Sequence, residues 1–116
     1  MTTTSTVDNG ILFIRLNGDL IGSPDTDQLV QSVNTHLGED FNQCAVDLSE
    51  IRYINSTGIS ILVSLLTKFR SRGGEMVIIN PADHPNKMLA VTKLNNIFTV
   101  SPDEATARQQ LTPAAN

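Results

Sequence analysis

Residues 52–59 read RYINSTGI and lead directly into residues 60–71, which read SILVSLLTKFRS. The second stretch has the length of a helix, and its polar side chains recur every three or four residues, which places them on one narrow stripe. These polar residues are Ser60, Ser64, Thr67, Lys68 and Ser71. The other positions are mostly aliphatic, and Gly73 and Gly74 follow, as is typical just past the end of a helix. The pattern predicts a mostly buried helix over residues 56–71.

The start of this helix carries the most informative residues. Asn55, Ser56 and Thr57 all have side chains that accept hydrogen bonds from free N–H groups at a helix N-terminus, so any one of them would cap the helix. Gly58 lies in the first turn, where glycine costs about 1 kcal/mol relative to alanine. A glycine there indicates that something approaches the backbone closely. Two adjacent hydroxyls at the positive end of a helix suit a covalently attached phosphate or a bound anion.

Residues 55–59 (NSTGI) resemble the motif D-S-[ST]-G-[LI] of bacterial anti-sigma-factor antagonists, the STAS-domain family. The resemblance also takes in residues 10–18 (GILFIRLNG), 46–49 (VDLS) and 73–78 (GGEMVI), which match strands of that family. It covers about residues 7–111. Two positions depart from the family pattern: Asn55 replaces the aspartate of the motif, and Ile21, two residues after Asp19, replaces an acidic residue. Both changes remove negative charge near the motif.

The family resemblance implies a non-enzymatic binding module that is switched by phosphorylation. The serine of the family motif is phosphorylated by a partner, and Ser56 is the matching position. The implied partners are an anti-sigma factor with serine-kinase activity, which binds the unphosphorylated chain, and a PP2C-type phosphatase, which restores it. A phosphate adds about −1.5 to −2 charges at neutral pH. Each 1.4 kcal/mol of repulsion weakens binding about tenfold, so the switch needs no conformational change.

Two other functions fit the same residues. Some STAS-like proteins are accessory subunits of lipid-transport ATPase complexes that dock through the same helix without phosphorylation, and Asn55 in place of aspartate favours this alternative. A small-molecule or nucleotide sensor would use the positive end of the helix as an anion site. No acid–base or nucleophile–base pair can be assembled from the sequence, so an enzyme is not expected.

The candidate partner-binding residues surround Ser56. Ile59 and Val63 lie on the first two turns of the predicted helix, and they are the candidates for a part of the helix that stays exposed as a docking face. Complete burial between the helix and the sheet is the other interpretation of these two side chains. Asp19 and Asp47 fall where strands are expected to end, at the edge where ligands gather in α/β sheets. Their other interpretation is a solvated loop charge.

The rest of the chain alternates between strand and helix patterns. Strands are predicted at residues 11–16, 43–48, 75–79 and 97–100, and helices at residues 23–37, 56–71, 85–94 and 101–111. A turn signal at residues 8–10 indicates an N-terminal hairpin, for which residues 1–6 supply a short strand or fray. Ser101, Pro102 and Glu104 have the pattern of a capped helix start. Residues 112–116 are expected to be a disordered tail.

The predicted fold class is therefore α/β. We expect a single STAS-like domain over residues 1–116, folded from about residue 7 to residue 111. It should contain a mostly parallel mixed sheet of about five strands packed with about four helices. The family resemblance further implies that the helices lie largely on one face of the sheet.

The composition narrows the classes of function. The net charge of −4 and the lack of a basic cluster argue against direct binding of nucleic acid. The single cysteine, Cys44, rules out an internal disulfide and fits a reducing compartment. The sequence shows no signal-peptide pattern and no apolar run long enough for membrane insertion, so a cytoplasmic location is expected. His36 and His84 lack metal-ligand spacing and are interpreted as surface residues, so neither a metal nor a cofactor is expected.

Overall fold

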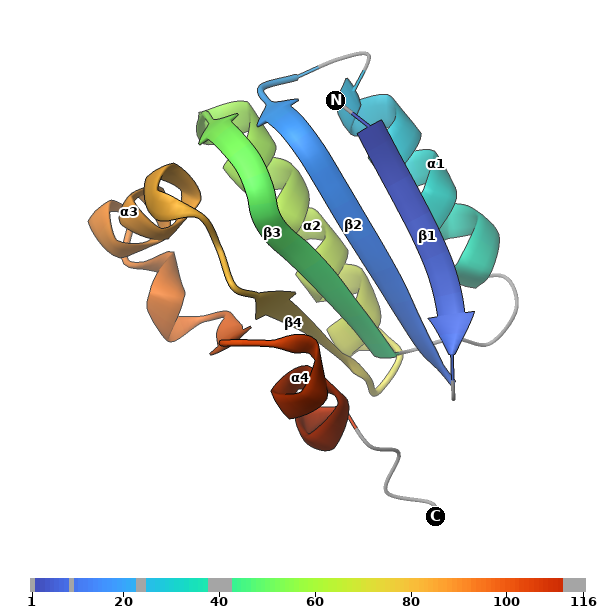
Figure 1. The fold of residues 1–116 in the computed structure, drawn as a ribbon. Coiled ribbons are helices and arrows are strands. Elements are labelled where there is room, and N and C mark those ends of the chain that lie inside the picture. Colours follow the sequence, from blue (N-terminus) through green and yellow to red (C-terminus); the bar gives the residue numbers. More distant parts are fainter. Residues whose placement is uncertain (1, 9, 23–24, 38–42, 112–116) are drawn as a thin grey trace.

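A computed structural model of the protein describes residues 2–8, 10–22, 25–37 and 43–111. Its strands are β1 (Thr2–Asp8), β2 (Ile11–Leu20), β3 (Gln43–Ile54), β4 (Glu75–Ile79) and β5 (Thr99–Ser101). Its helices are α1 (Asp25–Leu37), α2 (Ser56–Ser71), α3 (Asp83–Val91) and α4 (Glu104–Gln110), and a 3₁₀ turn, η1, spans Leu94–Asn96. Figure 1 shows how these elements are arranged.

The strands form one sheet in the order β1-β2-β3-β4-β5. The pair β1 and β2 is antiparallel, and every other neighbouring pair is parallel. This arrangement confirms the predicted mixed, mostly parallel sheet with an N-terminal hairpin. The hairpin strand β1 begins at Thr2, ahead of residue 7, where the folded part of the chain was expected to begin.

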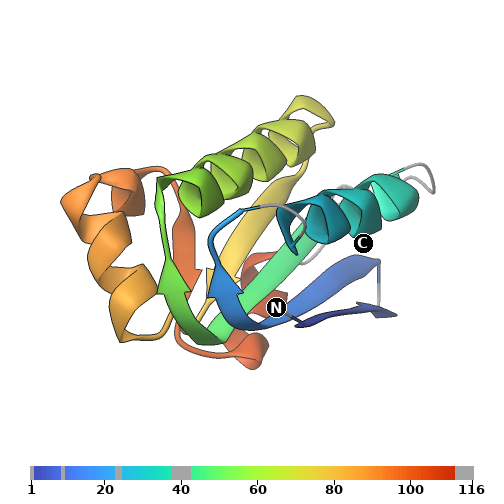
Figure 2. The ribbon, with the colours of Figure 1, turned by 90° about the horizontal axis from the view of Figure 1, so that it is seen from above.

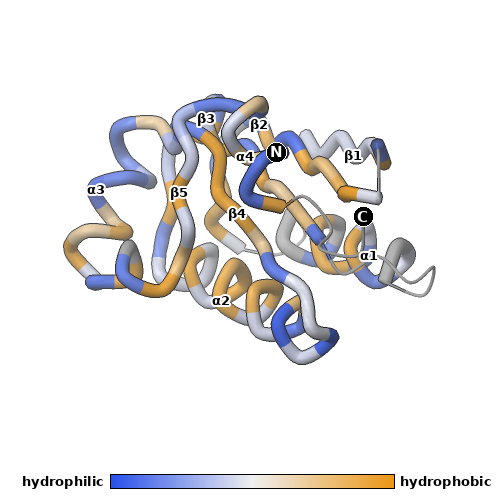
Figure 3. The backbone as a smooth tube through the Cα atoms, turned by 90° about the horizontal axis from the view of Figure 1, so that it is seen from below, coloured by the Kyte–Doolittle hydropathy of each residue, from blue (hydrophilic) through white to orange (hydrophobic). Residues whose placement is uncertain are grey.

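The helices cover the two faces of the sheet unequally. Figures 1 and 2 place α1 and α2 side by side on one face, whereas α4 lies on the opposite face and α3 lies at the side of β3. The expected one-sided arrangement therefore holds for the two long helices, and α4 is the exception. The strand β4 is hydrophobic along most of its length because it is buried on both faces (Figure 3).

Two clusters of buried side chains match these two faces. The larger cluster packs α1, α2 and α3 against the sheet, and its helical members are Leu29, Val33, Ile59, Leu62, Leu65, Leu66, Phe69 and Leu89. Fully burying one such side chain contributes about 1.5–3 kcal/mol. The smaller cluster holds α4 in place through Ala107 and Leu111, which pack on residues of β2, β3 and β4. The larger cluster fixes α2, and with it the position of the NSTGI stretch.

The strand β3 is longer than the sequence pattern predicts. The predicted strand ended at residue 48, but β3 continues to Ile54 because β2 pairs with it as far as Leu20, across two register shifts. The neighbour on the other side, β4, pairs only with the Gln43–Asp47 part of β3. Beyond that part α3 takes the place of a strand, and Ala82 N donates to Leu48 O at 3.2 Å. A helix thus covers a sheet edge that β4 leaves open.

The start of α4 also differs from its prediction. Ser101 was expected to cap this helix, but it belongs to β5, where it is buried and pairs with Ile79. Asp103 caps the helix instead, and its carboxylate accepts a hydrogen bond from Thr106 N at 2.8 Å. The predicted cap at residues 23–24, the helix stop at residue 38 and the tail at residues 112–116 lie outside the described residues.

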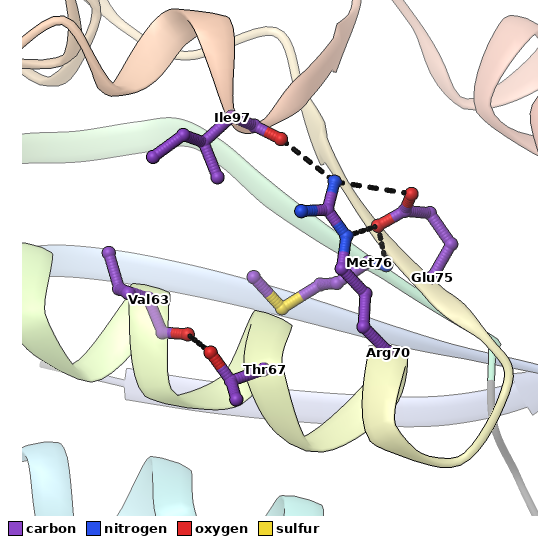
Figure 4. A network of polar contacts seen from close by, with 6 residues as sticks. All are labelled: Val63, Thr67, Arg70, Glu75, Met76 and Ile97. Carbon is purple, nitrogen blue, oxygen red and sulfur yellow. Dashed lines mark hydrogen bonds and ion pairs between the residues drawn. The ribbon is translucent and has the colours of Figure 1, made fainter.

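The end of α2 agrees with its prediction. The helix ends at Ser71, and Gly73 adopts a left-handed φ of 78° that suits glycine. Gly74 N then donates to Phe69 O at 2.9 Å. Figure 4 shows Arg70 reaching from α2 to Glu75 of β4, with 3.0 Å between Nε and Oε1, and to Ile97 O at 2.9 Å. These contacts fix the far end of α2 to β4 and to the segment before β5.

Gly58 determines how closely the first turn of α2 approaches the sheet. A Cβ atom at this position would lie 2.2 Å from Leu20 O and 2.9 Å from Ile54 Cγ1. Real Cβ atoms essentially never approach a neighbour that closely. The close approach that the sequence indicated at Gly58 is therefore that of the protein's own β2 strand.

We expect the variant Gly58→Ala to be less stable than wild type by about 2 kcal/mol or more, because its methyl group would collide with the Leu20 carbonyl. In an ordinary helix the same change is stabilising by about 1 kcal/mol, so the sign of the effect is diagnostic. Urea unfolding followed by circular dichroism measures it. Ser64→Ala, at an exposed position of the same helix, is the matched control. A Gly58→Ala midpoint at or above wild type would contradict the close contact.

Candidate functional site

Asn55 joins the start of α2 to the end of β2. Its backbone is extended, as an N-cap requires, and its Oδ1 accepts a hydrogen bond from Gly58 N at 3.0 Å. Its Nδ2 donates to Ile21 O at 2.9 Å, and its backbone N–H donates to Leu20 O at 3.4 Å. An aspartate could cap the helix in the same way, but a carboxylate has no N–H to give to Ile21. The side-chain amide of Asn55 therefore caps α2 and also ties the start of the helix to the residue after β2.

Ser56 and Thr57 are the first two residues of α2, and both are exposed. Neither caps the helix, because Asn55 does. Ile59 N donates to Asn55 O at 3.0 Å, so the N–H groups of Ser56 and Thr57 precede the hydrogen-bonded ladder. The first turn, which the structure describes completely, contains no acidic residue. The Ser56 side chain is thus exposed at the positive end of a helix whose first turn holds no compensating negative charge.

Asp19 lies near the carboxyl end of β2, as expected, and forms an ion pair with Arg52 of β3. Arg52 Nε donates to Asp19 Oδ1 at 3.1 Å, and Nη2 donates to Oδ2 at 3.0 Å. The Arg52 side chain is 81% exposed and that of Asp19 is 31% exposed. These hydrogen bonds, more than any other influence, hold the pKa of Asp19 below the ordinary value of an aspartate. The pair orders the sheet edge from which the chain enters α2.

Asp47 does not lie at a strand end, so that expectation was wrong. It lies within β3, because the strand runs on to Ile54. Ser49 donates to Asp47 Oδ1 through its backbone N at 2.8 Å and its Oγ at 2.6 Å, and Arg15 Nε lies 3.7 Å from Oδ2. All these partners belong to β2 and β3, so the contacts of Asp47 stabilise the sheet.

The predicted docking face on α2 is only partly available. Ile59 is 5% exposed and belongs to the larger core cluster, so the expectation that it stays exposed was wrong. The glycine contact at the first turn brings α2 close to the sheet and buries the neighbouring side chain. Val63, one turn further on, is half-buried and packs against the same cluster, so it retains some exposed surface.

His84, which was interpreted as a surface residue, is half-buried and contacts two residues of β3. Its Nδ1 accepts a hydrogen bond from Ile54 N at 3.2 Å, and its ring stacks on Tyr53 with 4.3 Å between centroids and 13° between planes. Sequence reasoning missed this pair because the partners come from β3 and α3, far apart in the chain. The unusual signal was an aromatic residue, Tyr53, at a polar strand end in a chain with only 4% aromatic residues.

The other features that could have indicated a function are a cysteine, a metal site and a membrane-spanning helix. Cys44 is fully buried in β3, and burial raises the pKa of its thiol, which keeps it protonated and unreactive. Within the described residues no group of three or more His, Cys, Asp and Glu side chains could hold a metal ion. No helix in the described part of the chain combines the length and the hydrophobicity needed to cross a membrane.

Comparison with known proteins shows which family the chain resembles. A model of the STAS domain matches residues 3–107. The anti-sigma-B factor antagonist of Listeria monocytogenes is 29% identical over 55 residues, which are 47% of this chain and 48% of that protein. The aligned part of the chain thus spans about half the length of the first curated relatives that it matches.

Solved structures show the same fold. An anti-sigma factor antagonist from Mycobacterium paratuberculosis has a TM-score of 0.81 at 19% identity, with 97% of this chain and 94% of that chain covered. The anti-sigma factor antagonist SpoIIAA in its unphosphorylated form has a TM-score of 0.74 at 14% identity, with 94% and 96% covered. SpoIIAA from Bacillus in its phosphorylated form has the same TM-score and identity, with 94% and 99% covered.

We expect Asn55→Ala to destabilise the protein by about 1–2 kcal/mol, because it removes the cap of α2 and the bond to Ile21 O. Asn55→Asp retains the capping oxygen and should recover part of that loss. Chemical unfolding of the two variants beside wild type measures both effects. Equal stability of Asn55→Ala and wild type would show that the amide does not hold the start of the helix.

We expect Arg52→Gln to raise the pKa of Asp19, because the hydrogen bonds that lower it are lost. In wild type the pKa of the folded state is depressed, so the stability from this pair is present above the ordinary aspartate pKa. It is lost as the pH falls through the lowered folded value. A titration of side-chain carboxyl carbons by NMR measures both proteins. An unchanged Asp19 pKa in the variant would contradict the assignment.

Proposed function

Because the chain belongs to the STAS-domain family, we propose that it is an anti-sigma-factor antagonist whose binding is switched by phosphorylation of Ser56. The observation that carries the proposal is the exposed position of Ser56 as the first residue of α2. Relatives and structural neighbours that are anti-sigma-factor antagonists support the same function, and one of these neighbours, SpoIIAA, has also been solved in a phosphorylated form.

The partner is an anti-sigma factor with serine-kinase activity. In the reaction the Ser56 Oγ bonds to the γ-phosphorus of the partner's ATP, the bond to the bridging oxygen breaks, and ADP leaves. The hydroxyl proton passes to a base, and the partner supplies both this base and the metal-bound nucleotide. This chain contributes a serine on a helix that is fixed at both ends. A PP2C-type phosphatase reverses the step by hydrolysing the phosphate ester.

The phosphate changes binding more than it changes folding. At the start of α2 it gains up to about 2 kcal/mol from the helix dipole and the free N–H groups, so the fold tolerates it. A partner surface that fits the neutral hydroxyl meets instead a group of about −1.5 to −2 charges. An unfavourable change of about 3 kcal/mol in the complex weakens binding by roughly two orders of magnitude. The switch therefore acts at the interface.

Residues near Ser56 complete the partner surface. Asn55, Thr57 and Gly58 shape the start of the helix, Asp19 borders it from β2, and the exposed part of Val63 continues along α2. Ile59 supports this surface from below because it is buried. The protein acts in the cytoplasm, where the kinase, the phosphatase and the sigma factor meet.

The test begins with each anti-sigma serine kinase of the same organism, purified and mixed with the chain and ATP. We expect one phosphate on Ser56, mapped by mass spectrometry, and unchanged phosphorylation of Ser64→Ala, the matched control at another exposed hydroxyl of α2. Calorimetry should show that Ser56→Asp binds the kinase at least about tenfold more weakly than Ser56→Ala. A phosphate elsewhere, or equal binding of the two variants, would refute the switch. Co-purification with a lipid-transport ATPase and no phosphorylation would favour the accessory-subunit function.

A further inference from the structure

An exposed aromatic residue, Tyr53, lies three residues before the start of α2 and is oriented by a stacking contact. Tyr53 is 52% exposed, yet its ring stacks on His84. His84 is itself fixed, because its Nδ1 accepts a hydrogen bond from Ile54 N where β4 no longer covers β3. The β3 backbone thus positions the His84 ring, and the His84 ring in turn positions Tyr53. A large apolar surface is thus presented to solvent in one orientation.

Few large apolar side chains of the described residues are exposed. They are Val7, Ile21, Tyr53, Val91, Ile97 and Val100. Of these, Ile21 and Tyr53 border Asn55: the Ile21 carbonyl accepts from Asn55 Nδ2, and Tyr53 precedes Asn55 by two residues. An immobilised aromatic side chain loses little further entropy when it enters a partner pocket, and tyrosine is enriched among residues that dominate interface energies.

Arg52 adds a charged group to the same edge. Its side chain is 81% exposed and is oriented by the two hydrogen bonds to Asp19. A guanidinium has five N–H donors, so donors remain for acceptors outside the protein. Arginine, like tyrosine, is enriched among the residues that contribute most to binding at protein interfaces. We use the name β-edge patch for Ile21, Arg52 and Tyr53, the exposed residues that flank Asn55 at the ends of β2 and β3.

The size of protein interfaces connects this patch to Ser56. A standard interface buries about 800 Å² on each partner, which corresponds to a round area with a radius of about 16 Å. Tyr53 is three residues from Ser56, so the two are separated by no more than about 11 Å of extended chain. An interface of this size that includes Ser56 is therefore wide enough to reach Tyr53.

We propose that Tyr53, positioned by His84, is the principal docking residue of the β-edge patch for the anti-sigma factor that addresses Ser56. The proposal rests on the proposed function. The partner provides an apolar pocket for the Tyr53 ring, beside aliphatic contacts for Ile21, and carboxylate or carbonyl acceptors for Arg52. His84 is a positioning residue, because it acts through Tyr53. Contacts of this patch provide most of the affinity for the partner, and a phosphate on Ser56 prevents the partner from binding.

The test measures the affinity of the unphosphorylated full chain for the purified anti-sigma factor by calorimetry. We expect Tyr53→Ala to weaken binding at least about tenfold and Tyr53→Phe to remain within about threefold of wild type, because the ring is kept. Val7→Ala is the matched control, since Val7 is also exposed but lies about 23 Å along the sheet from Tyr53. Unfolding midpoints confirm that each variant is folded.

Two His84 variants separate positioning from stability. His84→Asn keeps an acceptor for Ile54 N but removes the stacked ring, so it should weaken binding several-fold and abolish the ring-current shifts of the Tyr53 protons in NMR spectra. His84→Phe restores a stacked ring and should recover affinity even where the lost backbone bond lowers stability. If affinity instead follows stability across both variants, His84 has no positioning role and that part of the proposal is overturned.

The outcomes also distinguish this inference from the proposed function. If wild type binds and discriminates against Ser56→Asp, but Tyr53→Ala binds as tightly as Val7→Ala, the inference alone fails. If Tyr53→Ala loses affinity while Ser56→Asp does not, the docking residue stands and the phosphorylation switch fails. If no anti-sigma factor binds wild type, both are refuted.

Discussion

The contact between the first turn of α2 and the carbonyl group of Leu20 is the constraint on which the site depends. Only a residue without a Cβ atom allows this approach, and Gly58 supplies it. Asn55 strengthens the contact with hydrogen bonds to Gly58 and to Ile21. The helix therefore begins at a defined point above the carboxyl ends of β2 and β3. The exposed hydroxyl of Ser56 and the buried side chain of Ile59 both follow from that placement.

The same edge of the sheet is supported from a second direction. Because β4 is short, about half of β3 has no strand on its β4 side, and α3 fills that space. His84 completes the hydrogen bonding of the β3 backbone and at the same time orients Tyr53. A surface fixed on both sides needs little rearrangement on binding, which favours regulation by added charge over regulation by movement. Asp19 and Arg52 order the same edge by a bidentate ion pair.

Local patterns in the sequence predicted much of this architecture. The periodicity of residues 60–71 and the glycines after it located α2, and the pair of hydroxyls located its start. The sequence could not show which of two structures a residue joins when its local pattern fits one and its tertiary contacts favour the other. Ser101 has the pattern of a helix cap but is taken into β5 by Ile79, which leaves the cap to Asp103. Residues 49–54 contain too many polar side chains to resemble a strand, and only pairing with β2 makes them one. Contacts such as that of His84 join distant segments and leave no local pattern.

The central claim is that a charge on Ser56 changes what the surface binds and leaves the fold as it is. The most direct measurement compares backbone amide NMR spectra and thermal unfolding of the chain with phosphoserine and with serine at position 56. The account predicts shifts confined to the start of α2 and the adjoining ends of β2 and β3, with an unfolding temperature equal to or above that of the unmodified chain. Shifts that spread to β4, β5 and α4, or a clear loss of stability, would contradict it.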